Sequence, residues 1–251
     1  MTVPNMPDSD RVVVVLDPHR PTRAAVALAA AIARAGETRV EGVYIEDINV
    51  MRLGGLPEAR EITIHRGQVR VPDPAQLERE LRVLERAVRE VFETAAAAYG
   101  LAHRFAVLRG PLLAELSRFA AGARMVIFGR SQPLFGRSWW DVALADLLAS
   151  SLGDLAFVPD EVPARDGVVA FLDIEAAGSR VAEIADAIAA RTGVGRLLPL
   201  RRDAQRAPAG GIAAGGVGPR IRFLVIPGRV LEVAEVRACL GRADRTVVVV
   251  R

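Results

Sequence analysis

Val13-Val14-Val15-Leu16-Asp17, near the start of the chain, returns as Val169-Ala170-Phe171-Leu172-Asp173. Val126-Ile127-Phe128-Gly129-Arg130 returns, in the same order, as Val225-Ile226-Pro227-Gly228-Arg229. Each phrase is a short apolar run that reaches a polar residue or a glycine. Buried parallel strands have this pattern where their carboxyl ends meet a ligand crevice. The repetition therefore predicts two α/β units with parallel sheets in one chain.

The second unit is shorter than the first. The interval from Asp17 to Gly129 is 112 positions, about twice the 55 positions from Asp173 to Gly228. We predict a disordered leader at 1–10, a complete unit at 11–159, a linker at 160–166 and a truncated unit at 167–251. The last strands of the units, 155–158 and 246–250, are expected at sheet edges. Such apolar edges need partners, so they should pair with each other or between chains.

Composition narrows the class of protein. The chain has 251 residues, 51% of them hydrophobic, and no uncharged apolar run of the roughly 18–20 residues that a spanning helix needs. Its start lacks the pattern of a signal peptide, so we expect a cytoplasmic protein without membrane insertion. The basic side chains are all arginine, 33 against 30 acids, and they alternate with acids along helices. This pattern indicates solvated helix faces rather than a nucleic-acid surface.

The ends of the first strands outline a candidate site. Parallel strands should bring Asp17, Gly129 and the turn after Val43 together at a topological switch point. An aspartate there can bind a ribose or base, and a glycine lets a phosphate approach the backbone. Pro18 and Arg130 flank these positions. In the alternative interpretation Asp17 caps a helix and Gly129 makes a tight turn.

These residues, together with Gly42-Val-Tyr-Ile-Glu-Asp47, resemble the universal stress protein family in its tandem form. The resemblance covers residues 11–159 well and 167–251 weakly. It implies the family's Rossmann-like fold, of the adenine nucleotide alpha hydrolase kind. It also implies that domains pair through their last strands, as a homodimer or an intrachain pseudo-dimer.

The family's nucleotide motif is degenerate here. ATP-binding members carry Gly-x-x-Gly, nine residues, then Gly-Ser or Gly-Thr. Gly129 matches the first glycine, but Gln132 stands at the second and Val142-Ala143 stand at the last pair. ATP or another adenine nucleotide stays a candidate cofactor, with Gly136, Arg137 and Ser138 as a displaced anion-binding loop. The second half also lacks the second glycine, and we expect it to be structural.

Other patterns carry less chemistry. The three histidines, at 19, 65 and 103, do not have metal-ligand spacing, and no Gly-x-Ser-x-Gly elbow is present. Cys239 is the single cysteine, and we interpret it as a small buried residue. Trp139-Trp140 could stack on a base, anchor a partner or pack inside the protein.

Two segments carry unusual apolar patterns. The connection 48–71 holds Met51, Leu53, Leu56, Ile62 and Ile64. We expect these to be buried, either as a lid over Trp139-Trp140 or, as we favour, against a second chain. The following segment has apolar residues at steps of four and three: Leu77, Leu81, Leu84, Val88, Val91 and Ala95. This spacing predicts a helix from Pro74 to about Gly100 that lies on the sheet.

Three functions follow from these patterns. The first is a non-enzymatic, universal-stress-like binding or regulatory protein with a degenerate pocket. The second is an ATP-binding stress protein with at most slow hydrolysis, using Asp17, Gly129, Gly136 and Ser138. The third is a structural adaptor with a vestigial pocket, whose partner surface combines residues 48–71 with Trp139-Trp140.

Overall fold

The structure is a computed structural model that describes most of the chain. The described residues are 10–17, 22–33, 38–48, 52, 55–62, 67, 69–130, 139–150, 152–159, 167–173, 178–194, 197–201, 221–228, 231–240 and 245–251. The expected leader (but for Asp10), the linker 160–166 and the glycine-rich stretch 202–220 lie outside them.

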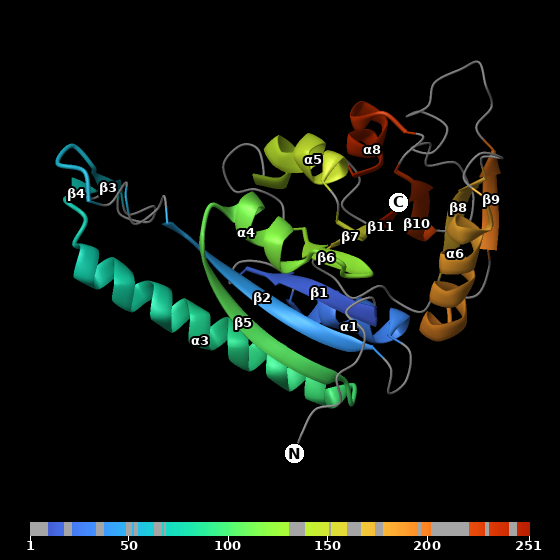
Figure 1. Cartoon of the computed structure of the whole chain (residues 1–251), viewed down its shortest axis with the longest axis horizontal. Coiled ribbons are helices and arrows are strands. Elements are labelled where there is room, and N and C mark those ends of the chain that lie inside the picture. Colours follow the sequence, from blue (N-terminus) through green and yellow to red (C-terminus); the bar gives the residue numbers. More distant parts are fainter. Residues whose placement is uncertain are drawn as a thin grey trace.

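Nine strands form one sheet in the order β5-β2-β1-β6-β7-β11-β10-β8-β9 (Figure 1). Neighbouring strands are parallel except β7 and β11, which are antiparallel. The bounds of the strands are β1 Arg11–Leu16, β2 Arg39–Asp47, β5 Ala102–Gly110, β6 Met125–Gly129, β7 Asp154–Val158, β8 Val168–Asp173, β9 Leu197–Arg201, β10 Ile221–Pro227 and β11 Thr246–Val250. Two parallel blocks therefore run in opposite directions and meet at β7 and β11.

The two strands that we expected to pair do pair with each other. Phe157, Ala156 and Leu155 of β7 lie opposite Val247, Val248 and Val249 of β11. Each strand is the last of its own block, and the pairing places both in the interior of the common sheet. No edge is left there for another chain.

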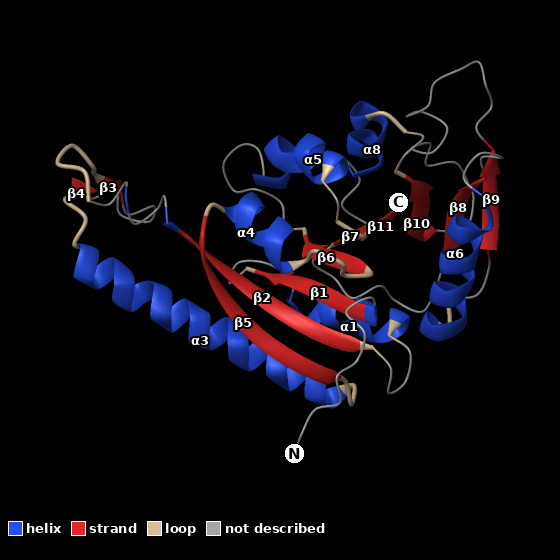
Figure 2. Cartoon of the chain, viewed as in Figure 1, coloured by secondary structure: helices blue, strands red, loops and turns tan. Residues whose placement is uncertain are grey.

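Helices cover both faces of the sheet (Figure 2). Their bounds are α1 Thr22–Ile32, α3 Pro74–Ala98, α4 Leu112–Phe119, α5 Trp139–Ala149, α6 Gly178–Thr192 and α8 Val233–Leu240. On one face, α1, α3 and α6 enclose a core that includes Val12, Phe92 and Val248. On the other face, α4, α5 and α8 enclose a core that includes Val13, Leu116 and Val249. Each core draws residues from both blocks.

The register of the sheet corrects the sequence alignment of the two halves. A two-fold axis through the centre of the β7–β11 pair relates Ala156 to Val248. Ala156 pairs with Ile127, and Val248 pairs with Val225. Ile127 therefore corresponds to Val225, whereas the repeated phrases aligned Val126 with it. By the same relation Arg130 corresponds to Gly228, and their backbone N–H groups donate to the equivalent carbonyls of Val158 and Val250.

The first pair of repeated phrases, which aligned Val13 with Val169, is also out of register by one residue. The registers β1–β6 and β8–β10 make Val12, rather than Val13, the counterpart of Val169. Val12 and Val169 share one core, whereas Val13 lies in the core on the other face. Since alternate residues of a strand face opposite sides, a slip of one residue would exchange these faces. Asp173 therefore corresponds to Leu16 and is not a second copy of Asp17.

Candidate functional site

The first block places Asp17 and Gly129 at a switch point of the sheet. β1 lies between β2 and β6, and Val15 pairs with Phe128 on the β6 side. Asp17 directly follows β1, and Gly129 is the last residue of β6. The structure thus brings these two predicted residues to neighbouring strand ends, which is where open α/β sheets bind ligands.

Val43 does not lie at this edge. Its side chain is fully buried in the core beside Val13 and Leu116. We expected a turn after Val43, but β2 continues to Asp47 because β5 pairs with it along all nine residues. The ligand edge of β2 is therefore formed by its final residues, and the assignment of Val43 to the site rim is corrected.

Arg130 joins the two halves of the molecule. Only 6% of its surface is exposed, although it carries a charge. Its Nη1 donates to the carbonyl of Leu240 at the end of α8, and its Nη2 donates to the carbonyl of Arg245 just before β11, each at 2.5 Å. Because both carbonyls belong to the second half, the guanidinium directly after Gly129 is committed to the protein interior.

The remaining predicted site residues lie outside the described part of the chain. These are Pro18, Gly136, Arg137 and Ser138, together with Gln132. Trp139 and Trp140 begin α5. The backbone of α5 is described there, but the placement of the two indole rings is not.

Tyr44 of β2 is a buried polar residue near Asp17 and Glu46 that the sequence analysis missed. It is 5% exposed and packs in the core beneath α3. Burial raises the pKa of the Tyr44 phenol, and the carboxylates of Glu46, Asp17 and Glu85 raise it further. The hydroxyl therefore stays protonated at neutral pH. A tyrosine inside an apolar strand that ends in Glu-Asp is the sequence signal that could have marked it.

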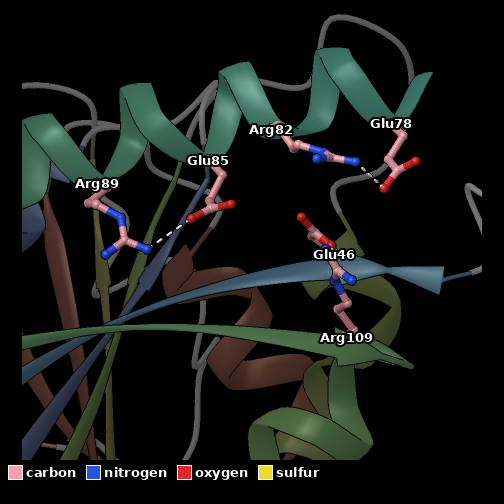
Figure 3. Close-up of polar contacts among 6 residues, drawn as sticks. All are labelled: Glu46, Glu78, Arg82, Glu85, Arg89 and Arg109. Carbon is pink, nitrogen blue, oxygen red and sulfur yellow. Dashed lines mark hydrogen bonds and ion pairs between the residues drawn. The ribbon is translucent and has the colours of Figure 1, made fainter. Parts of the chain in front are cut away.

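Ion pairs surround this part of the rim (Figure 3). Arg109 of β5 donates to Glu46 of β2 at 2.6 Å. On α3 above them, Arg89 pairs with Glu85 and Arg82 pairs with Glu78. Two of the three carboxylates near Tyr44, those of Glu46 and Glu85, are thus paired with arginines of the same chain.

The end of β10 differs from the end of β6. A Cβ atom added to Gly228 would lie 2.5 Å from Cγ1 of Val249, so the backbone packs directly on β11. Asp173 ends β8 opposite Arg201 of β9. The antiparallel meeting of the blocks puts this edge at the other end of the sheet from Asp17.

A second set of polar contacts joins the halves at the start of β7. Asp154 is 1% exposed, and its carboxylate accepts from Arg180 Nη2 and from the backbone N–H of Arg251, each at 2.9 Å. The Arg251 guanidinium donates to the carbonyl of Leu148 in the last turn of α5 and to that of Leu152, which follows the helix. Each half therefore has the end of its last helix bound by an arginine that follows a strand of the other half.

Other candidate groups are accounted for within the described ranges. Cys239 is buried as expected, and burial raises the pKa of its thiol to about 11. The described residues hold no cluster of three or more His, Cys, Asp or Glu suited to a metal ion. In the same ranges, no helix has the length and apolar character to cross a membrane.

Comparison with solved structures identifies the fold. A universal stress protein from Archaeoglobus fulgidus DSM 4304 superimposes with a TM-score of 0.65 and 12% identity, over 97% of this chain and 96% of its own. A protein from the universal stress protein family from Burkholderia pseudomallei is 18% identical over 60% of this chain and 96% of its own, with a TM-score of 0.39. No family model and no curated protein sequence matches the chain.

The chain therefore has the universal stress protein fold, as the resemblance of its sequence to that family implied. The likeness to the Archaeoglobus fulgidus protein extends over nearly the whole of both chains and so includes both parallel blocks. At 12% identity it establishes the fold.

Proposed function

We propose that this chain is a cytoplasmic, non-enzymatic binding or regulatory protein of the universal stress type, with a degenerate nucleotide crevice in its first half. Its two blocks act as an intrachain pseudo-dimer. The two-fold register about β7 and β11 supports this arrangement. The truncated second half serves to complete the sheet and to hold the end of β6.

The observation that carries the proposal is the placement of Arg130. A residue directly after the strand-end glycine would be well placed to meet a phosphate. Here its guanidinium is buried and donates to Leu240 and Arg245 of the second half. Because a buried charge must keep its partners, turning this side chain toward a ligand would leave two carbonyls without their donor. The position supports assembly of the halves rather than binding of a triphosphate.

The second candidate is an ATP-binding stress protein with at most slow hydrolysis. Asp17 and Gly129 favour it, because the neighbouring strands β1 and β6 bring them to the same edge. That geometry is the part of a nucleotide site that this chain keeps.

Mass spectrometry of the small molecules that leave the purified protein on denaturation tests the proposal. We expect no stoichiometric nucleotide, and we expect phosphate release from Mg·ATP at the rate of a protein-free blank. Recovery of about one adenine nucleotide per chain, or phosphate release that depends on protein concentration, would favour the second candidate.

A further inference from the structure

The long helix α3 is only partly used by the fold. Its residues packed in the core, Val88, Phe92 and Ala96, all belong to its second half. Residues 74–87 hold no buried side chain, and the stripe residues Leu77, Leu81 and Leu84 are only partly covered. Figure 1 shows this end of α3 running past the strands of the sheet. The expected helix on a sheet is thus confirmed for the second half of α3 alone.

A small hairpin continues this overhang. β3 (Glu61–Ile62) and β4 (Val69–Arg70) pair antiparallel and stand beyond the sheet (Figure 1). Ile62 lies opposite Val69, and Val71 follows on the same face. These three side chains are 62–65% exposed. The alternation gives the ribbon one apolar face. The backbone of Glu61 pairs in register with that of Arg70.

The hairpin and the helix are tied together. Asp73 caps α3 by accepting from the N–H of Ala75, and Pro74 opens the helix. Arg70 of β4 reaches Gln76 in the first turn at 3.5 Å. We call the described residues of 55–87 the overhang. Leu56 and Val83 also belong to it and are 50% and 64% exposed. Of the five apolar residues that we expected to be buried, Leu56 and Ile62 have described side chains, and both are exposed within this chain. Their burial against a second chain stays a prediction.

The charges of α3 fit a second copy of the same helix. Residues 73–80 carry three acids and one arginine, whereas residues 82–89 carry three arginines and one acid. Two such helices lying antiparallel would place each acidic segment against a basic one. Two ion pairs within the chain, Arg79 with Asp73 and Arg82 with Glu78, are largely exposed and can exchange partners. Arg89 is held within its own chain by Glu85 and by the ring of Phe105.

The same charges argue against other partners. Residues 55–90 carry seven acids and seven arginines, so this part of the chain has no net charge. A nucleic acid or an anionic membrane would select an excess of arginine. An apolar face with internally balanced charges suits an isologous contact, in which the same patch serves both subunits.

We propose that the overhang is a dimerisation surface, on which a second copy of this chain binds with its α3 antiparallel. The proposal deals with a surface remote from the β7–β11 joint, and it stands whether or not the crevice binds a nucleotide. The acidic segment ends at residue 80 and the basic segment begins at residue 82, so the two-fold axis of the dimer would pass close to residue 81. Val83 is the nearest exposed apolar side chain and is expected to face its own copy across the two-fold axis.

Light scattering of the full chain measures the state of assembly. We expect twice the chain mass of 26.9 kDa for the unaltered protein. The variant Ile62→Ser/Val69→Ser should raise the dissociation constant of the dimer about 100-fold, since two apolar side chains lose their cover. Tyr99→Ser is the matched control, because Tyr99 is 53% exposed at the other end of α3. It should keep the double mass.

Cross-linking tests the orientation. Val83→Cys should form a linked dimer with a short bismaleimide, whereas Tyr99→Cys should not. The far-ultraviolet circular dichroism spectra of all variants should match that of the unaltered chain, since the altered side chains are exposed and the fold is kept. The serine variant should melt at a lower temperature only to the extent that it loses the stabilisation of the dimer. A single-chain mass of the unaltered protein at tens of micromolar would overturn the proposal, as would a double mass that survives the serine variant. Equal linking of both cysteine variants would overturn the antiparallel arrangement.

Discussion

Arg130 was expected to contribute to an anion-binding site, but its side chain joins the two halves of the molecule instead. In the sequence it follows a strand-end glycine and stands where an anion could bind. In the fold it reaches across the sheet to Leu240 and Arg245. Its partners are 110 and 115 positions away, so no local pattern could have predicted them. Arginine suits this role because one planar guanidinium can donate to two carbonyls in fixed directions.

Replacing Arg130 should therefore affect stability. Arg130→Met removes both donors and should lower the free energy of unfolding by about 2–4 kcal/mol, because two buried carbonyls lose their partners. Arg130→Lys should recover little of this free energy, because a single ammonium group cannot donate to both carbonyls as the planar guanidinium does. Urea unfolding measures the change. Arg118→Met is the control: the Arg118 side chain is 76% exposed in a surface pair, so its loss should cost at most about 0.5 kcal/mol. A variant at Arg130 that unfolds like the unaltered chain would refute the joining role.

Gly42 determines how closely helix α3 can pack on strand β2. It lies in β2, where a glycine weakens a strand unless another group must come close. A Cβ atom there would lie 2.8 Å from Cε1 and Cζ of Phe92 on α3 and 2.9 Å from Cδ1 of Leu16. The absent side chain thus lets the buried half of α3 settle onto the sheet.

Gly42→Ala should lower the free energy of unfolding by about 1–3 kcal/mol through overpacking against the Phe92 ring. Phe92→Leu made in the same chain should recover part of this loss. A double-mutant cycle by urea unfolding measures the coupling between the two positions. Strictly additive effects would show that Phe92 does not limit the space at Gly42.

At the scale of elements, periodicity predicted most of the structure. The alternation of apolar runs and helical stripes gave the order of strands and helices, and the strand at 246–250 was placed with the correct bounds. The ends of β2 were not predicted, because the full-length partner β5 extends it. The overhang of α3 was not predicted either, because an apolar stripe does not tell how much of it a sheet will cover.

At the scale of the whole molecule, the repeated phrases indicated the architecture but not the register. Apolar runs of valine and isoleucine match each other at several offsets, and only the pairing across β7 and β11 selects one. The selected offset leaves Asp17 without a counterpart at Asp173 and makes Gly228 equivalent to Arg130. The two parallel blocks therefore differ at the ends of their equivalent strands.

The proposed function requires that the strand ends at Asp17 and Gly129 do not bind a nucleotide. Calorimetric titration with Mg·ATP tests it most directly, on the unaltered chain and on Asp17→Ala side by side. We predict no saturable binding below about 1 mM, a free energy weaker than about −4 kcal/mol, and no difference between the two proteins. Micromolar, magnesium-dependent binding that Asp17→Ala abolishes would contradict the account and would identify the chain as an ATP-binding protein.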